Sequence, residues 1–259
     1  MNYFENMFSL RGKTAVLVGG GGVLGSAMAC ALGKAGAHLA VVCPVCDHIN
    51  RLQTCANEEN IMFKFYQSDA SVRSETEQTA REIMEEFGRV DILVNAAGIN
   101  SATPFLEISD DEWDRIMRVN LKSAFLTCQV FGRIMLDQGE GGSIINISSV
   151  SSGPPLSRVF TYSVSKAGLN NLTQNLAREW APHKIRVNAI RPGFFPAEQN
   201  KKILDKKRTE DIFRHTPMAR FGEPDELAGT ILWLASEKAA SYVTGAIICV
   251  DGGYTAMSI

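Results

Sequence analysis

Short apolar runs alternate along this chain with longer stretches in which apolar residues recur at helical spacing. The short runs are almost continuously apolar, which is typical of strands covered on both faces. We expect strands at residues 14–18, 38–43, 62–66, 92–94, 143–147, 185–190 and 246–250. We expect helices at residues 24–36, 47–59, 72–87, 110–137, 161–181, 198–214 and 224–236. Repeated strand–helix units predict a parallel sheet with helices on both faces.

No linker, repeat or low-complexity segment interrupts this alternation, so we expect a single domain over residues 1–259. Only residues 194–217, between the last two expected strands, differ in character, because they are rich in charged side chains. We interpret this segment as an insertion over one end of the sheet. In sheets of this kind, ligands bind beyond the carboxyl ends of the strands. The informative residues should therefore follow the strands.

The composition limits the class of protein. The chain has 259 residues, 45% of them hydrophobic, which is enough for a substantial core. With 26 basic and 28 acidic side chains, it lacks the excess of positive charge that nucleic-acid binding needs. The first residues include Glu5 and lack the basic start of a secretory signal. We expect a cytoplasmic protein with no nucleic-acid or membrane partner.

The six cysteines are scattered along the chain. Cys43 and Cys46 have C-x-x-C spacing, but neither a second such pair nor a pair of histidines follows to complete a zinc site. We therefore expect ordinary buried or loop thiols and no bound metal.

A glycine cluster, Gly19–Gly22 with Gly25, lies between the first expected strand and the first expected helix. Glycine lets the backbone approach a pyrophosphate closely, and the helix N-terminus offers free N–H groups to the anion. This position favours a dinucleotide site over a plain turn. The second strand ends in Val42-Cys43-Pro44, with neither a carboxylate for the ribose of NAD nor a basic group for the phosphate of NADP. The missing carboxylate slightly favours NADP, and both cofactors remain open.

Four polar residues predict a catalytic group. Tyr162 and Lys166 are four residues apart, so a helix places them on one face, and Ser149 and Asn120 come from other elements. We expect the Lys166 ammonium to lower the pKa of the Tyr162 phenol. Tyr162 would then exchange a proton with a carbonyl or alcohol oxygen that Ser149 polarises. Lys166 would also reach a nicotinamide ribose, and Asn120 would hold a water that links Lys166 to solvent.

Taken together, these motifs resemble the short-chain dehydrogenase/reductase family over nearly the whole chain. The matching residues are Val18–Gly25, Asn95–Gly98, Asn120, Ser149, Tyr162 with Lys166, Arg191–Gly193 and Val250–Gly253. The resemblance implies a single-domain Rossmann fold with a seven-stranded parallel sheet. It also implies an NAD(P)-dependent oxidoreductase that interconverts a ketone and a secondary alcohol, and a homotetramer.

The same resemblance implies which residues hold the cofactor. Asp69 should face the adenine, Asn95 and Gly98 should support the adenosine side, and residues 192–195 should meet the nicotinamide. The full cofactor set is Gly19, Gly21, Gly22, Val23, Leu24, Gly25, Cys43, Asp69, Ala70, Asn95, Ala96, Gly98, Tyr162, Lys166, Pro192, Gly193 and Phe195.

Residues 192–200, 215–224 and 251–257 resemble the branch of D-mannonate oxidoreductases (fructuronate reductases) and gluconate 5-dehydrogenases. That branch implies a sugar or sugar-acid substrate, whose carboxylate needs a cation. The candidate substrate residues are Ser149, Arg158, Gln199 and Asn200. For residues 198–214 the alternative is a solvated charged helix. A 3-oxoacyl-carrier-protein reductase and a non-catalytic NAD(P) sensor remain alternative functions.

Overall fold

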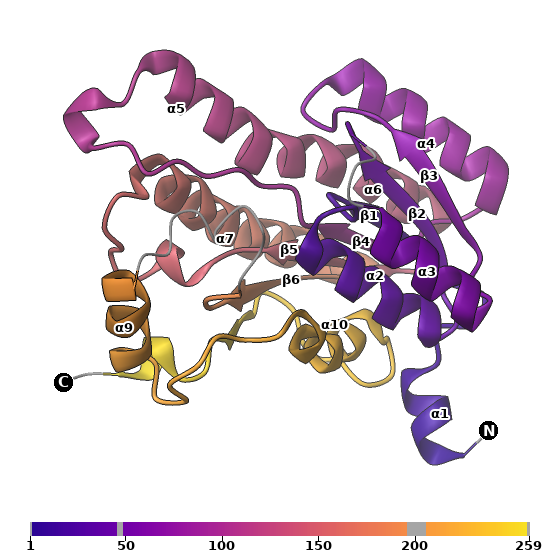
Figure 1. The fold of residues 1–259 in the computed structure, drawn as a ribbon. Coiled ribbons are helices and arrows are strands. Elements are labelled where there is room, and N and C mark those ends of the chain that lie inside the picture. Colours follow the sequence, from indigo (N-terminus) through magenta and orange to yellow (C-terminus); the bar gives the residue numbers. More distant parts are fainter. Residues whose placement is uncertain (1, 46–48, 196–205, 258–259) are drawn as a thin grey trace.

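The computed structural model describes residues 2–45, 49–195 and 206–257, and within them the strands form one parallel sheet (Figure 1). The seven strands lie in the order β3-β2-β1-β4-β5-β6-β7, which confirms the expected parallel sheet. Their bounds are β1 Thr14–Val18, β2 His38–Cys43, β3 Phe63–Gln67, β4 Ile92–Asn95, β5 Gly142–Ile147, β6 Ile185–Pro192 and β7 Ile247–Val250.

Helices cover both faces of this sheet (Figure 1). One face packs against α2 (Val23–Lys34), α3 (Asn50–Glu59) and α10 (Ala228–Ala235). The other face packs against α4 (Arg73–Phe87), α6 (Ser123–Gln138) and α7 (Phe160–Trp180). The remaining helices are α1 Tyr3–Phe8, α5 Asp110–Met117 and α9 Lys206–Arg214, with short helical turns at η1 Phe105–Glu107, η2 Arg118–Lys122, η3 Val150–Ser152, η4 Ala181–His183, η5 Pro224–Leu227 and η6 Tyr254–Ala256.

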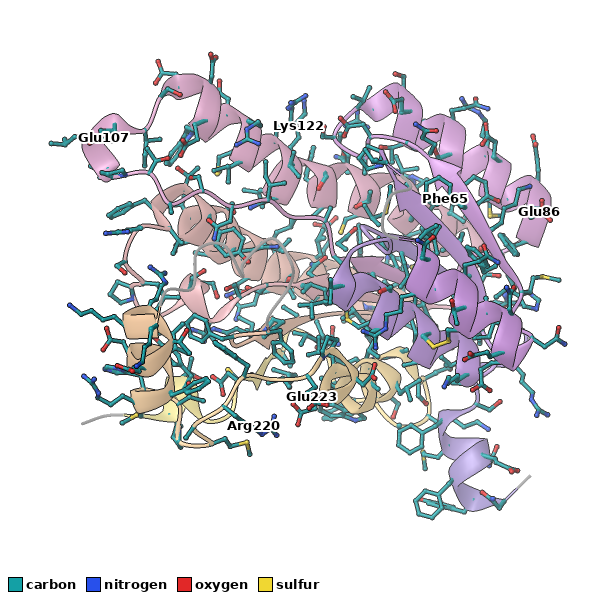
Figure 2. All side chains as sticks on the ribbon, viewed as in Figure 1. Phe65, Glu86, Glu107, Lys122, Arg220 and Glu223 are labelled. Carbon is teal, nitrogen blue, oxygen red and sulfur yellow. A yellow bond between two sulfur atoms is a disulfide. The ribbon has the colours of Figure 1, made fainter. Side chains whose placement is uncertain are left out.

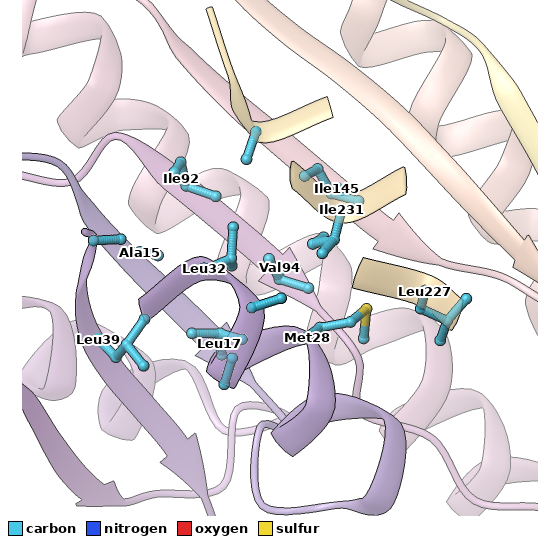
Figure 3. Close-up of a cluster of buried hydrophobic side chains, with 14 of the residues drawn as sticks. Ala15, Leu17, Met28, Leu32, Leu39, Ile92, Val94, Ile145, Leu227 and Ile231 are labelled. Atoms are coloured by element: carbon cyan, nitrogen blue, oxygen red, sulfur yellow. The ribbon is translucent and has the colours of Figure 1, made fainter. Parts of the chain in front are cut away.

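The continuous apolar runs in the sequence reflect this double coverage. All residues of β1 are buried: Leu17 joins the cluster with α2 and α10, while Val16 and Val18 join the opposite one. In Figure 3, Leu17 and Met28 lie in one cluster with Ile231 of α10. Because neighbouring residues of a strand point to opposite faces, both faces must be apolar when both are covered.

The strand order reverses at β1, which pairs with β2 on one side and β4 on the other. The residue partners Val18 and Asn95 bring the carboxyl ends of β1 and β4 side by side. A reversal of this kind leaves a crevice at the carboxyl edge, where ligands of parallel sheets bind. The fold therefore directs attention to the residues that follow β1, β4 and β5.

The structure differs from the expected helices in several places. The expected helix 110–137 is interrupted by the π-helical turn η2, and the expected helix 224–236 begins as the 3-10 turn η5. The helix α1 was not predicted. The expected helices 47–59 and 198–214 are described only from residues 49 and 206 onward, where α3 and α9 lie. The π turn has a consequence for the site, because it carries Asn120.

The expectation of ordinary thiols is wrong for Cys30 and Cys55, which form a disulfide between α2 and α3. Their Cα atoms lie 6.2 Å apart, within the range that a disulfide spans. The two cysteines are separated by 25 residues and belong to no motif, so only the packing of α2 on α3 reveals the pair. Cys46 lies outside the described residues, and the C-x-x-C pair is therefore untested.

Candidate functional site

The glycine loop after β1 is shaped by close backbone contacts. Gly19 has a φ of +79°, and a Cβ built there would lie 2.6 Å from the backbone nitrogen of Ala97. A Cβ on Gly25 would collide with the carbonyl oxygen of Gly19. Helix α2 begins at Val23, and the N–H groups of a first helical turn have no acceptor within their own helix. This cradle fits a pyrophosphate, because it has bare backbone and unused donors at one place.

Cys43, at the end of β2, lies directly against this loop. The Gly21 backbone N–H donates to the Cys43 Sγ at 3.1 Å, so the thiol stands where a ribose-binding carboxylate is usual. Arg51 of α3 pairs with Asp225 of η5 at 2.6 Å. Arg51 is therefore paired with a carboxylate of η5 and does not place a basic group at the end of β2.

Asp69 and Ala70 follow β3 in a turn that the Asp69 carboxylate organises. The Asp69 Oδ1 accepts hydrogen bonds from the Ser71 N–H at 2.9 Å and the Ser71 hydroxyl at 2.7 Å. The Asp69 N–H donates to Glu75 at 2.7 Å, and Ala70 is buried. The side chain of Asp69 is thus held by its own turn, and contact with an adenine stays a prediction.

Asn95 is buried in a polar network that joins four elements. The Thr127 hydroxyl donates to the Asn95 Oδ1 at 2.7 Å, and the Asn95 amide donates to the Asn146 Oδ1 at 2.9 Å. The Asn146 amide in turn donates to the Thr173 hydroxyl at 2.8 Å. Asn95 therefore links β4 to β5 and α6 through buried hydrogen bonds. Ala96 continues the ladder by donating to the Val18 carbonyl.

The structure brings Ser149, Tyr162 and Lys166 together, as the sequence predicted. The Lys166 Nζ lies 5.7 Å from the centroid of the Tyr162 ring, one turn away along α7. Ser149 follows β5, and its hydroxyl is the neighbour that lowers the pKa of the Tyr162 phenol. Lys166 is only 3% exposed, and its Nζ donates to the Ile147 carbonyl at 2.7 Å. Burial of an ammonium with one neutral partner is costly and is typical of functional sites.

Asn120 joins this group from the π turn η2. Its Oδ1 accepts from the Ile99 N–H at 2.8 Å, and its amide donates to the Ile99 carbonyl at 2.9 Å and to the Ser165 hydroxyl at 3.1 Å. A Cβ built on Gly98 would lie 3.3 Å from the Lys166 Nζ and 3.7 Å from the Asn120 Oδ1. Gly98 therefore leaves the space in which Asn120 and Lys166 approach each other.

The protonation states depend mainly on burial. Burial raises the pKa of Tyr162, and the hydrogen bond with Ser149 opposes this shift only in part. Burial also lowers the pKa of Lys166 to about 8. The expectation of an acidic phenol is therefore wrong for this structure, because burial disfavours the phenolate and raises the pKa of Tyr162. At neutral pH the phenol carries its proton and can donate it.

Residues after β6 pack against those after β7. The Gly193 N–H donates to the Val250 carbonyl at 2.9 Å, and a Cβ on Gly193 would lie 2.7 Å from the Cα of Asp251. Pro192 is the last residue of β6, and Phe195 is buried in the core cluster beside α10. Phe195 thus supports the wall that was expected to meet the nicotinamide.

Two neighbours of Ser149 were not among the predicted site residues. Arg191 donates from its Nε to the Ser149 carbonyl at 3.4 Å and from its Nη2 to the Val150 carbonyl at 3.2 Å. Ser151 donates to the Ser149 Oγ from both its backbone and its hydroxyl. The sequence offers a hint for Arg191 in the Arg-Pro-Gly motif, but Ser151 lies in a run of serines with no distinctive signal.

Of the candidate substrate residues beyond Ser149, the structure describes Arg158, while Gln199 and Asn200 lie outside the described residues. Arg158 is exposed in the loop between η3 and α7, with a φ of +65°. The charged Arg158 side chain thus lies just before α7, the helix that carries Tyr162.

The segment after α9 is held by Arg220, which pairs with Glu226 at 2.7 Å; Figure 2 labels Arg220 and the nearby Glu223.

The described part of the chain lacks two further features, a membrane-spanning helix and a metal-binding cluster. No described helix combines the length and apolar character needed to cross a bilayer. The described residues also contain no cluster of three or more histidine, cysteine or acidic side chains arranged to hold a metal ion.

Comparison with known proteins gives a consistent result. Residues 22–255 match a family model described as enoyl-(acyl carrier protein) reductase. A 2-dehydro-3-deoxy-D-gluconate 5-dehydrogenase of Bacillus subtilis is 38% identical over 255 residues, covering 98% of this chain and 99% of the relative. An NAD-dependent glycerol dehydrogenase of Listeria innocua is 36% identical over 252 residues, covering 97% of each chain.

A solved structure is similar to this chain over almost its whole length. The gluconate 5-dehydrogenase of Burkholderia cenocepacia, in complex with NADP and tartrate, superimposes with a TM-score of 0.92 at 31% identity. The match covers 99% of this chain and 100% of that one. Similarity over almost the whole of both chains means that the sheet, the helices and the crevice all have counterparts there.

Proposed function

Because this chain belongs to the short-chain dehydrogenase/reductase family, we propose that it interconverts a ketone and a secondary alcohol on a sugar acid. The chain is an NAD(P)-dependent oxidoreductase acting on CH–OH groups, in keeping with its relatives. The single observation that carries the proposal is the grouping of Ser149, Tyr162 and Lys166, with Gly98 next to the Lys166 Nζ. Three polar side chains from two elements converge at the carboxyl edge of the sheet.

The chain's own residues perform the acid–base part of this reaction. A nicotinamide, when bound, would supply or accept the hydride. The loop of Gly19 to Gly25 would hold the phosphates through backbone N–H groups, and Lys166 and Asn120 would lie beside the ribose. The Ser149 hydroxyl donates to the substrate oxygen, and the Tyr162 phenol gives that oxygen its proton. In the oxidation direction Tyr162 takes the proton back.

The substrate class is proposed from the named relatives and from charge. One relative is named for a dehydro-deoxy-gluconate, and one solved neighbour holds tartrate, which is a hydroxy acid. We propose that Arg158 binds the substrate carboxylate, because an exposed guanidinium in this loop can form a bidentate pair. Gln199 and Asn200 are proposed to bind substrate hydroxyls. Because one relative is named a glycerol dehydrogenase, uncharged polyols are the second class of substrate to assay.

We propose NADP over NAD by a narrow margin. Cys43 places a neutral thiol at the end of β2, where a carboxylate would repel the extra phosphate of NADP. The relatives include both an NAD-dependent enzyme and an NADP complex, so a paired assay must decide. Equal or better turnover with NADH would contradict the preference for NADP, and the proposed reaction would still stand.

The proposed assembly is a homotetramer of single-domain subunits, each spanning residues 1–259, in the cytoplasm. Large apolar side chains stay exposed on the helical layer of α5 to α7, namely Trp113, Phe125, Phe160 and Val164. Such a surface is typical of contacts between subunits. Light scattering of the purified protein measures the assembly directly.

The first experiment tests the acid. Purified protein is mixed with NADPH or NADH and keto sugar acids, and the loss of cofactor absorbance is followed. Tyr162→Phe should lower kcat by about 100-fold or more, because it removes the proton donor and little volume. Cofactor binding should persist in this variant.

The same assay separates the alternatives. Turnover only on carrier-bound 3-oxoacyl substrates would favour a 3-oxoacyl-carrier-protein reductase. Cofactor binding without turnover on any carbonyl would favour a non-catalytic sensor. Wild-type rates in Tyr162→Phe would show that another group donates the proton.

A further inference from the structure

Arg191, near the end of β6, reaches across to the turn that carries Ser149. Its Nε donates to the Ser149 carbonyl at 3.4 Å, and its Nη2 donates to the Val150 carbonyl at 3.2 Å. A guanidinium can only donate and a carbonyl can only accept, so the direction of both bonds is fixed by chemistry. The side chain of one β6 residue therefore holds two consecutive main-chain carbonyls, and the first belongs to Ser149.

Gly153, which caps the end of η3, provides the space for this contact. A Cβ built on Gly153 would lie 1.8 Å from the Arg191 Nη2 and 2.8 Å from the Arg191 Cζ. The guanidinium thus lies against bare backbone, in a place that the side chain of any other residue would take. The Gly153 N–H also donates to the Val150 carbonyl at 3.3 Å, so Arg191 and Gly153 meet at one acceptor.

The charge of Arg191 is directed to the main chain. Among the residues that the structure describes, Arg191 forms no ion pair and donates only to the carbonyls of Ser149 and Val150. Hydrogen bonds from a charged donor are stronger than those between neutral groups. A half-buried guanidinium that contacts only backbone therefore acts as a clamp on that backbone.

The other contacts of the Ser149 carbonyl do not fix the turn to the sheet. The Ser152 N–H and hydroxyl donate to this carbonyl at 3.0 Å and 2.6 Å, but Ser152 belongs to the same turn and moves with it. The ladder between β5 and β6 continues as far as the Ser148 N–H, which donates to the Ile190 carbonyl at 2.7 Å. Beyond that bond, the side chain of Arg191 carries the connection from β6 to the turn.

We propose that Arg191 is a positioning residue that holds the Ser149 main chain on β6 and so keeps the Ser149 hydroxyl in place for the substrate oxygen. The proposal rests on the proposed function, in which Ser149 polarises that oxygen. Pro192 and Gly193 follow Arg191 directly and belong to the segment expected to meet the nicotinamide. Arg191 thus sets the distance between the polarising hydroxyl and the wall of the hydride donor, and it acts through Ser149.

The first test combines Arg191→Met with Ser149→Ala in a double-mutant cycle, assayed with NADPH and keto sugar acids. Arg191→Met keeps most of the side-chain length but has no donor, so kcat should fall about tenfold while KM for NADPH stays within about twofold. In Ser149→Ala the same change should lower kcat no further, because the positioned hydroxyl is already gone. The melting temperature should fall equally in both backgrounds, because the Ser149 carbonyl remains.

The second test displaces the guanidinium without removing it. The methyl group of Gly153→Ala would meet the Arg191 Nη2, so kcat and the melting temperature should fall as they do in Arg191→Met. Added to Arg191→Met, Gly153→Ala should change neither quantity, because the atoms that it would meet are absent. Gly229→Ala is the matched control and should keep the wild-type kcat, because no atom lies within 4 Å of a Cβ built there.

The outcomes separate positioning from a general loss of structure. A wild-type kcat in Arg191→Met overturns the proposal. An equal fold loss of kcat in the Ser149→Ala background also overturns it, because Arg191 would then act through another group. A further loss when Gly153→Ala is added to Arg191→Met contradicts the clamp. If the wild-type protein turns over no ketone, the proposed function fails, and the melting temperatures of the Gly153 cycle still decide whether Arg191 holds the turn.

Discussion

Gly25 shows how a single hydrogen atom in place of a side chain shapes the site. The backbone of α2 passes so close to the carbonyl of Gly19 that any Cβ on Gly25 would meet it. This contact brings the start of α2 onto the end of β1. The N–H groups of the first turn of α2, which have no acceptor in their own helix, then lie next to the end of β1.

We predict that Gly25→Ala weakens NADPH binding by about tenfold or more, because the loop must open to admit the methyl group. Titration of cofactor fluorescence measures the dissociation constant. Gly229→Ala in α10 is the matched control, because no atom lies within 4 Å of a Cβ built there. An unchanged dissociation constant in Gly25→Ala would contradict the assignment of this loop to the phosphates.

Ser149 and Asn120 illustrate the limit of reading single residues. The sequence predicted both as site residues, and the structure places both beside α7. It did not predict that the Ser151 N–H would donate to the Ser149 Oγ, because this contact depends on the geometry of the turn and not on residue type. It also overestimated the effect of Lys166 on Tyr162, because burial cannot be read from spacing.

At the scale of elements, the π turn η2 decides where Asn120 points. Apolar residues recur regularly before and after this turn, so the sequence predicts one uninterrupted helix. The wider turn shifts the side chains that follow it, and Asn120 is 1% exposed with its amide bound to Ile99 and Ser165. π turns inside helices are frequently found at functional sites.

The disulfide is the second feature of this scale, since it joins α2 to α3. We predict that Cys55→Ser, or reduction of the wild-type protein, lowers the free energy of unfolding by about 3 kcal/mol. Chemical denaturation with and without a thiol reductant measures this difference. The reductant should have no further effect on Cys55→Ser.

Cys249→Ser serves as the control, because Cys249 is an exposed free thiol. This variant should keep the wild-type response to the reductant. A wild-type stability that ignores the reductant would show that Cys30 and Cys55 remain thiols in the purified protein.

At the scale of the whole molecule, burial of the Lys166 ammonium lowers the stability of the fold and places this charge in the candidate site. The pKa of Lys166 is lowered to about 8 from its ordinary value of 10.5, so between these values the unfolded chain binds more protons than the folded one. Stability from this group therefore rises with pH across that window. Below pH 8 the full cost of the buried charge is present.

We predict that the stability advantage of Lys166→Met over wild type narrows by about 2 kcal/mol between pH 7 and pH 10, because deprotonation relieves the wild-type protein. Denaturation curves at several pH values measure the difference. Lys122→Met changes an exposed lysine, labelled in Figure 2, and is the control for removing a lysine whose side chain is not buried. A constant gap for Lys166→Met would contradict the burial of a charged ammonium.

The sequence by itself determined the alternation of strands and helices, the glycine loop and the residues that meet at the carboxyl edge. These follow from local rules: the period of apolar residues, the freedom of glycine, and the spacing of Tyr162 and Lys166 on one helix turn. Only the tertiary structure decided the pairing of Cys30 with Cys55, the network around Asn95 and the burial of Lys166. Those features depend on which groups from distant segments share a dry space, and burial there lowers the pKa of Lys166.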